Sequence, residues 1–219
     1  MRSTARSCQS AKGPAMTPTE YGPPAGAGLP LDSGILGGRV RLRPFELADA
    51  EALRAWFSNP EMLQFLAIAP YQMSVAAEEE FIRSKATNDW DHGIALGIEA
   101  LDIGDEPVLI GTVALRLMSL ESRLGDLGIA IGDPQYWNRG YGEDVVRTIC
   151  LYGFEDLDLH RIGLQVASYN ARAQRCYEKI GFVVEGRQRE SRYVAGRYCD
   201  STVMGLLRSE FEAAEQAGR

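Results

Sequence analysis

Residues 125–144 read GDLGIAIGDPQYWNRGYGED, and this stretch predicts a β-strand, a loop and the beginning of a helix in succession. In its first part Leu127, Ile129 and Ile131 alternate with small residues, which is the period of two expected of a strand. The Gly-Asp-Pro run at 132–134 ends that strand, because glycine and proline favour turns. We therefore expect the strand to lead directly into a glycine-containing loop.

The loop of residues 137–142 is followed by a segment with helical periodicity, because apolar side chains recur at helical spacing over 141–157. The first N–H groups of a helix have no partner inside the helix, and the helix dipole favours an anion beside them. Gly140 and Gly142 let the backbone approach such a ligand without an intervening Cβ. The loop matches neither the phosphate-loop nor the dinucleotide pattern, so an anion-binding loop and an ordinary strand–turn–helix joint both remain open.

This loop resembles the acyl-CoA-binding motif of the GNAT superfamily of N-acyltransferases, usually written Q/R-x-x-G-x-G/A. Gly140-Tyr141-Gly142 supplies the second half of the motif. The first position departs from it, because Trp137 stands where the motif has Gln or Arg. An aromatic residue there is familiar in the branch that resembles ribosomal-protein N-terminal acetyltransferases.

A second stretch, NARAQRCYEKIGF at 170–182, resembles the GNAT motif N-x-x-A-x-x-x-Y-E-K-x-G-F at every fixed position. Residues 41–45, 185–187 and 196–200 are also similar to the ribosomal-protein branch, so the resemblance covers about 38–208. Two motifs in the correct order carry the assignment, since no single residue establishes it.

Three residues of the second motif also have simpler interpretations. Asn170 suits the N-cap of a helix, and Gly181 suits its left-handed C-cap. Tyr177 lies on an apolar helical face and can be a core residue.

The order of elements predicts an α/β domain. We expect strands at 39–43, 93–101, 107–118, 125–131, 160–167, 182–192 and 197–207, and helices at 46–57, 74–88, 141–157 and 170–180. The strand–helix–strand unit implies a right-handed crossover and a parallel pair. The resemblance implies a GNAT-like mixed, mostly antiparallel sheet of about seven strands with flanking helices and a splayed central parallel pair. Residues 1–37 are expected to form a flexible tail, 38–208 the acetyltransferase domain, and 209–219 a polar tail.

Composition limits the classes of partner. The 219 residues carry a net charge of −7, which argues against nucleic-acid and anionic-membrane binding and suits a cationic partner such as an amine. The four cysteines and two histidines show no metal-ligand spacing, so no metal is expected. No apolar run reaches membrane-spanning length and no secretory signal opens the chain, so we expect a cytoplasmic protein.

The resemblance implies acetyl-CoA as the co-substrate. Its pantetheine would contact the backbone of Ile129, Ala130 and Ile131 and the side chain of Asn170. Its pyrophosphate would contact N–H groups of the loop, which comprises Trp137, Asn138, Arg139, Gly140, Tyr141 and Gly142, with Arg139 adding charge. The Tyr177 hydroxyl would lie near the sulfur and act as general acid, because a phenol is protonated at neutral pH.

The general base is open between two candidates. Some relatives carry a Glu where this chain has Gln165, and an amide cannot accept the proton. Asp126 is the alternative, although it can equally be a carboxylate at the strand edge, and a water chain is the other candidate.

The implied function is acetyl transfer to a primary amine, either a protein N-terminus or a small amine. The alternative function is an acyl-CoA-binding sensor or scaffold without turnover, although retention of Tyr177 beside Asn170 favours the enzyme. A homodimer is a further expectation from the family.

Overall fold

The structure is a computed structural model that describes residues 34–66, 74–85 and 93–217. Its strands are β1 (Ile35–Leu36), β2 (Val40–Arg43), β3 (Ile94–Ala100), β4 (Val108–Ser119), β5 (Leu124–Ile131), β6 (Arg161–Ala167), β7 (Val183–Val194) and β8 (Arg197–Leu207). Its helices are α1 (Ala50–Phe57), α2 (Pro60–Leu63), α3 (Val75–Lys85), α4 (Tyr141–Glu155), α5 (Ala171–Ile180) and α6 (Arg208–Ala217), with single 3-10 turns at Leu47–Asp49 and Pro134–Tyr136.

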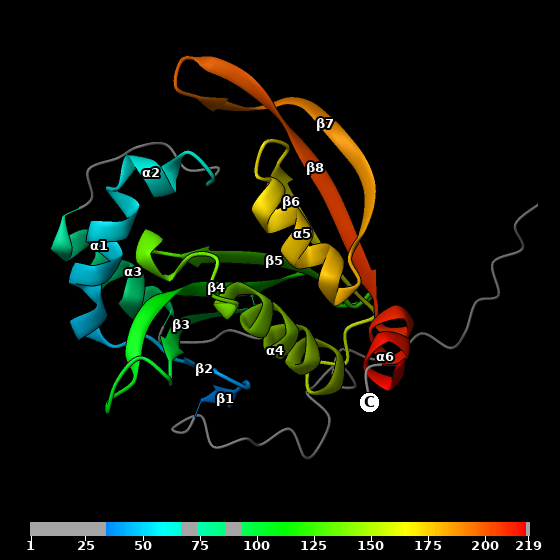
Figure 1. The fold of residues 1–219 in the computed structure, drawn as a ribbon, viewed down its shortest axis with the longest axis horizontal. Helices are drawn as coiled ribbons and strands as arrows, with labels where there is room; N and C mark the ends of the chain where they lie inside the picture. Colours follow the sequence, from blue (N-terminus) through cyan, green and yellow to red (C-terminus); the bar gives the residue numbers. More distant parts are fainter. Residues whose placement is uncertain (1–33, 67–73, 86–92, 218–219) are drawn as a thin grey trace, which may run out of the picture.

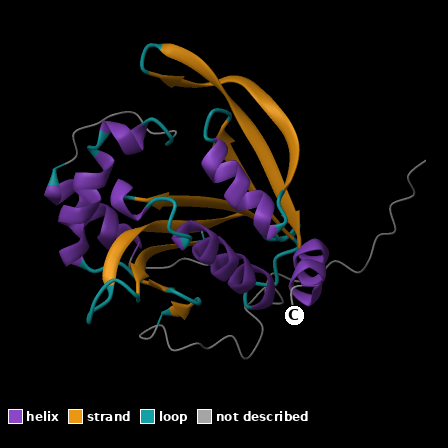
Figure 2. Ribbon diagram, in the orientation of Figure 1, coloured by secondary structure: helices purple, strands orange, loops and turns teal. Residues whose placement is uncertain are grey.

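The strands form one eight-stranded sheet in the order β1-β2-β3-β4-β5-β6-β8-β7. All neighbours are antiparallel except β5 and β6, which run parallel and are joined through α4. Helices α4 and α5 lie together beside the middle of the sheet, and α1 to α3 form a separate group at one side of the molecule (Figure 1). The long β7–β8 hairpin extends away from the rest of the sheet. Figure 2 shows the same division between the strands and the two groups of helices. The predicted fold class is therefore confirmed.

The parallel pair is splayed. The strands β5 and β6 pair only from Leu124 to Asp126 and from Arg161 to Gly163, although β5 continues to Ile131 and β6 to Ala167. Beyond Asp126, no strand of the described residues pairs with the edge of β5 that faces β6. Because backbone N–H and C=O groups need partners, this opening is suited to a ligand that can supply them.

The main hydrophobic core lies between the sheet and α4. Val145, Val146, Ile149 and Phe154 of α4 are completely or almost completely buried there. Strand side chains such as Leu115 complete this core, which fixes α4, and with it the glycine loop, against β5 and β6.

Two differences from the expected elements involve the chain ends. Ile35–Leu36, within the expected tail, pairs with β2 as the short strand β1, while residues 1–33 lie outside the described part of the chain. Where the sequence suggests only a polar tail, Arg208–Ala217 form α6, because Phe211 is buried and its ring lies 5.4 Å from that of Phe154. One aromatic residue in a polar segment gives too weak a period to predict this helix.

The expected helix at 46–57 is a 3-10 turn followed by α1, and α3 is described to Lys85, so the last residues of the helix expected at 74–88 lie outside the described residues. The turn begins after Glu46, whose N–H donates to the carboxylate of Asp49 at 2.8 Å. Arg43 holds the same carboxylate with two hydrogen bonds, which ties α1 to the end of β2.

Candidate functional site

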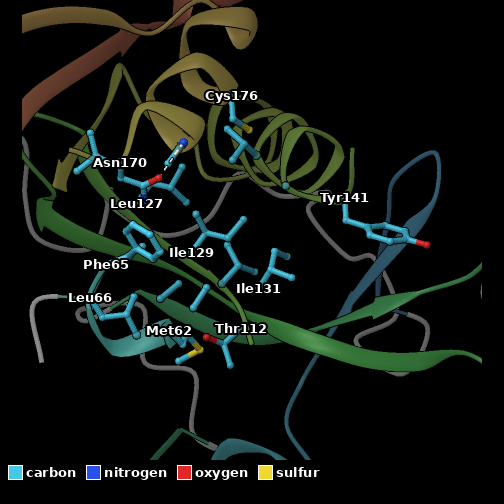
Figure 3. A pocket seen from close by; sticks show the side chains of 18 of the residues that line it. Met62, Phe65, Leu66, Thr112, Leu127, Ile129, Ile131, Tyr141, Asn170 and Cys176 are labelled. Carbon is cyan, nitrogen blue, oxygen red and sulfur yellow. Dashed lines mark hydrogen bonds between the residues drawn. The ribbon is translucent and has the colours of Figure 1, made fainter. Parts of the chain in front are cut away.

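A cavity of about 1070 Å³ opens at the splay between β5 and β6. Every residue that the sequence singles out lines it, and these are Asp126, Ile129, Ala130, Ile131, Trp137, Asn138, Arg139, Gly140, Tyr141, Gly142, Asn170 and Tyr177. In Figure 3 the side chains of Leu127, Ile129 and Ile131 follow β5 through the cavity. Asn170 and Cys176 approach it from the α5 side, while Met62 and Thr112 lie on the opposite side of β5.

The loop before α4 has the backbone geometry of an anion-binding turn. Gly140 is the N-cap of α4 with φ +88°, and Asn138 also has a positive φ, of 59°. Gly140 offers no side-chain cap, so the first N–H groups of α4 remain available to a ligand in the cavity. The sequence alone leaves an ordinary joint possible, whereas this geometry favours the anion-binding interpretation.

Trp137 fills the position where the motif has Gln or Arg. Its Nε1 donates to the carbonyl oxygen of Ile131 at 2.8 Å, which fastens the loop to the end of β5. The guanidinium carbon of Arg172 lies 3.9 Å from the centroid of the indole ring, and the ring of Phe65 meets it edge-on at 5.9 Å. Burial lowers the pKa of Arg172, which still carries its charge at neutral pH. The motif allows an arginine at the position of Trp137, and here Arg172 of α5 places a positive charge beside that position instead.

Arg39 braces the loop from outside. Its Nη1 donates to the carbonyl oxygen of Arg139 at 2.5 Å, and its Nε forms an ion pair with Asp102 at 2.7 Å. Asp102 also accepts a hydrogen bond from the hydroxyl of Tyr141 at 2.6 Å, and burial together with this bond raises the pKa of the phenol. The carboxylate of Asp144 accepts the backbone N–H of Arg39 at 2.6 Å. Together these bonds hold the first turn of α4 in place.

Replacing Arg39 by alanine is therefore expected to weaken acetyl-CoA binding about tenfold, since one charge-assisted hydrogen bond to the loop is lost. The melting temperature should hardly change, because the Arg39 side chain is substantially exposed. Calorimetric titration with acetyl-CoA measures the effect. Arg123→Ala is the matched control, since that arginine forms an exposed ion pair with Asp158 away from the cavity. Equal affinities for the two variants would contradict this role of Arg39.

The backbone of β5 divides between its two neighbours. Gly132 donates its N–H to Ile110 of β4, and the carbonyl oxygen of Ala130 points at Gly111 of β4. Because backbone groups alternate along a strand, Ile129 and Ile131 direct theirs toward the splay. This corrects the expectation for Ala130, whose backbone is turned to β4 and which lines the cavity through its methyl group. Because successive residues of a strand direct their backbone N–H and C=O groups to opposite edges, three successive residues cannot all face the splay.

Asn170 is the N-cap of α5, and Tyr177 lies about two turns further along the same face of that helix. The Asn170 Oδ1 accepts the N–H of Ala173 at 3.2 Å, so the residue caps the helix and still lines the cavity with its amide group. Tyr177 is 9% exposed, packs against Phe182, and burial raises its pKa. Among the described residues no hydrogen-bond partner accompanies its hydroxyl. Asn170 is thus a helix N-cap and Tyr177 a core residue, and both still line the cavity.

The positions considered for a general base are Asp126 on β5 and Gln165 on β6, of which only Asp126 carries a carboxylate. Asp126 forms an ion pair with Arg116, its cross-strand neighbour on β4. Gln165 on β6 lines the cavity, and its carbonyl oxygen accepts a long hydrogen bond of 3.5 Å from Arg192. Asp126 therefore lines the cavity as a carboxylate that is already paired with Arg116.

Arg192 is a buried cation that the sequence does not single out. It is 9% exposed, and it donates to Ser201 at 2.9 Å and to the carbonyl oxygen of Phe65 at 3.1 Å. Burial lowers its pKa, and no carboxylate pairs with it within the described segments. It joins the β7–β8 hairpin to the segment after α2 across the cavity. The sequence around Arg192 gave no sign that this residue is buried, because buried and exposed side chains do not alternate regularly along β7.

Other basic residues missed by the sequence reasoning cluster near the glycine loop. Arg172, Arg175 and Lys179 of α5 line the same cavity as the loop. Lys179 forms an ion pair with Glu143 at 2.9 Å. The spacing of three and four residues on one helix was the signal that could have found them. This concentration of cations beside free helix N–H groups suits a ligand with several phosphate charges.

The described residues hold no group of three or more His, Cys, Asp or Glu side chains that could bind a metal ion. In the same part of the chain, no helix is both long and apolar enough to cross a membrane.

Comparison with known proteins identifies the family. A family model described as "Acetyltransferase (GNAT) domain" matches residues 39–183. The uncharacterized N-acetyltransferase YoaA of Bacillus subtilis is 31% identical over 170 residues, covering 78% of this chain and 94% of that protein. YdaF of Bacillus subtilis, named as a candidate ribosomal N-acetyltransferase, is 31% identical over 116 residues, covering 53% of this chain and 62% of that protein.

A solved structure of an enzyme with bound ligands has the same fold. The crystal structure of spermidine N-acetyltransferase from Vibrio cholerae in complex with CoA and spermine aligns with a TM-score of 0.71 and 27% identity. The alignment covers 80% of this chain and 98% of that one. Since the family model spans well over half of the sequence, the chain belongs to the GNAT family of N-acetyltransferases.

Proposed function

We propose that this protein transfers the acetyl group of acetyl-CoA directly to a primary amine held in the same cavity. The amine nitrogen attacks the thioester carbon, the new C–N bond forms, and the C–S bond breaks. The nitrogen loses its proton to a base, for which Asp126 or a water molecule is available. Tyr177 gives its proton to the sulfur and regains one from solvent. Acetyl-CoA supplies the activated acyl group, and every other task falls to side chains and backbone of this chain.

The residues around the glycine loop fit the phosphates of the co-substrate. The first N–H groups of α4, which no side chain caps among the described residues, support this, as do the nearby cations Arg139, Arg172, Arg175 and Lys179. The backbone groups of Ile129 and the N–H of Ile131 face the splay and are suited to the amides of pantetheine, while the carbonyl oxygen of Ile131 accepts from Trp137. The Nδ2 of Asn170, whose Oδ1 caps α5, is suited to add a donor on the opposite wall.

The observation that carries the proposal is the position of Tyr177, a buried phenol without a hydrogen-bond partner in the described residues, on the wall of that same cavity. Burying an unpaired hydroxyl costs free energy, which a core phenylalanine in its place avoids. Burial raises the pKa of Tyr177, so the hydroxyl keeps its proton throughout the neutral range. Burial also raises the pKa of the departing thiol, so the difference in pKa between the phenol and the thiol stays small enough for the proton to be transferred.

A covalent route through Cys176 is disfavoured. This residue also lines the cavity, but burial raises the pKa of its thiol to about 11. The thiolate is the nucleophilic form of cysteine, so little of it exists at neutral pH. Direct attack by the amine therefore needs fewer assumptions than an acetyl-enzyme intermediate.

For the acceptor we favour a small amine of the polyamine class over a protein N-terminus. In sequence the Vibrio cholerae enzyme named for spermidine is 35% identical over 103 residues and YdaF is 31% identical over 116 residues, and the solved structure of the Vibrio cholerae enzyme aligns with this chain over 98% of its length. The net charge of −7 also suits a polycation. Acceptors of the ribosomal-protein class stay as the second candidate.

The test is release of the CoA thiol from acetyl-CoA with a panel of amines, including diamines, polyamines, aminoglycosides and short peptides, with the acetylated product identified by mass spectrometry. We expect acetylated diamine or polyamine together with stoichiometric thiol. Acetylation of peptides alone would replace the polyamine class by the N-terminal class. Tight acetyl-CoA binding with no acetylated product from any amine would favour a sensor or scaffold and contradict the proposal.

A further inference from the structure

The cavity continues to the face of the sheet opposite α4. Residues paired across β3, β4 and β5 project to one face, and on this face they are small: Ala95, Thr112, Ala114, Gly128 and Ala130. A Cβ added at Gly128 would meet nothing within 4 Å, so space is open above this floor. A Cβ at Gly132 would strike the ring of Trp56 at 2.0 Å, which shows that α1 covers the same face.

The opposite wall of this space is mostly aromatic and aliphatic. It comprises Phe45, Phe57, Met62, Leu63, Glu78 and Phe81, which come from the segment before α1, from α1 itself, from α2 and from α3. We call the space between this wall and the small-residue floor the acceptor groove. The basic residues suited to bind phosphate lie on the other side of β5, near the start of α4 and along α5. The acceptor groove and these basic residues therefore occupy different parts of the same cavity.

Glu78 is the exception in this wall. It is a carboxylate that is only 3% exposed, on α3, and it lines the cavity. Among the described residues it has neither an ion pair nor a side-chain hydrogen bond. Its neighbours on the helix differ, because Glu79 pairs with Arg83 at 3.1 Å and Glu80 is exposed. Desolvation raises the pKa of Glu78, as expected of a carboxyl group without a compensating charge.

The other charges of the groove are already compensated. Asp126 and Arg116 form an ion pair on the same face of the sheet. Burying a carboxylate without a partner lowers the stability of the folded protein, and this cost is offset where a ligand supplies the partner. Aromatic rings near a carboxylate also suit an alkylammonium ion, which interacts with both.

We infer that Glu78 binds a second, non-reacting ammonium group of the acceptor, so that the groove selects amines that carry two cationic nitrogens joined by an apolar chain. The reacting nitrogen would then lie at the splay near Tyr177, with the apolar chain between the small-residue floor and the aromatic wall. This inference rests on the proposed function, since it assigns the acceptor end of the same cavity.

The test compares diaminobutane with butylamine, which differ by the second amine alone. In Glu78→Gln the kcat/KM for diaminobutane should fall about 10- to 100-fold, mainly through KM, because one buried charge-assisted contact is lost. The value for butylamine should stay unchanged. Glu80→Gln is the matched control, since it makes the same chemical change on the exposed face of α3 and should affect neither amine. Glu78→Asp, which keeps the charge, should retain part of the preference.

A second measurement separates this inference from the proposed function. Calorimetric titration of both amines into the CoA-saturated protein reports binding without turnover. The wild type should bind diaminobutane more tightly than butylamine, and Glu78→Gln should lose that difference while melting no lower than the wild type. Failure to acetylate any amine would contradict the proposed function alone. Equal losses for both amines, or an undiminished diamine preference in Glu78→Gln, would overturn the assignment of Glu78.

Discussion

Replacing Tyr177 by phenylalanine is expected to reduce turnover about 100- to 10,000-fold, the range in which general acids contribute. The substitution removes one oxygen and keeps the ring that packs against Phe182. Acetyl-CoA affinity should change far less, because the contacts expected for the co-substrate come from backbone groups and from other side chains. Steady-state kinetics and calorimetry on the same purified variant separate these two effects.

Two controls make the result interpretable. The melting temperature of Tyr177→Phe should equal or exceed that of the wild type, since the hydroxyl removed is buried and unpaired in the described structure. Tyr152→Phe removes a half-buried phenol from α4 outside the cavity and should leave turnover unchanged. Because burial raises the pKa of Tyr177, its ionisation should not limit the rate at mildly alkaline pH, and the rate should rise as the amine loses its proton. A stable Tyr177→Phe variant with near-native turnover would return this residue to a structural role.

Placing aspartate at Gly140 is expected to weaken acetyl-CoA binding by at least about 100-fold. A carboxylate there would enter the position proposed for the pyrophosphate, and like charges about 5 Å apart repel by roughly 3 kcal/mol at an effective dielectric constant near 20. The backbone of Gly140 has a positive φ, so any side chain adds strain as well.

Gly140→Asn is the matched variant that separates charge from strain. Asparagine has nearly the same size as aspartate and tolerates the left-handed region comparably, but it is neutral. The Asn variant should therefore bind acetyl-CoA much more tightly than the Asp variant, and added salt should narrow the gap. Equal affinities for the two variants in a calorimetric titration would show that no phosphate lies beside this residue.

The sequence predicts the fold well because its strongest signals are local. The alternation of Leu127, Ile129 and Ile131, the helical period after Gly140 and the cap residues Asn170 and Gly181 each reflect physics within a few residues. Their order then allows few topologies, and the parallel pair follows from the crossover through α4, whereas its splay was implied by the family resemblance. The weakly periodic ends of the chain, β1 and α6, depend on distant packing partners and were missed for that reason.

The candidate site could be predicted only where residues belong to contiguous motifs. The loop positions and Asn170 and Tyr177 were found and line one cavity, whereas the cations of α5 were missed. Arg39, Glu78 and Arg192 were missed, because their significance comes from contacts between segments far apart in the chain. The expectation for Ala130 was wrong in one respect, since a motif names consecutive residues whereas a strand turns their backbone groups to alternate sides.

The most direct test of the central claim is one matrix of initial velocities, in which thiol release is measured over a range of acetyl-CoA and diamine concentrations. If the amine attacks the thioester while both substrates occupy the cavity, double-reciprocal plots should intersect, and release should require the amine. Parallel lines would indicate an acetyl-enzyme intermediate of the ping-pong type. Parallel lines, or thiol release that does not depend on the amine, would contradict direct transfer in a shared cavity.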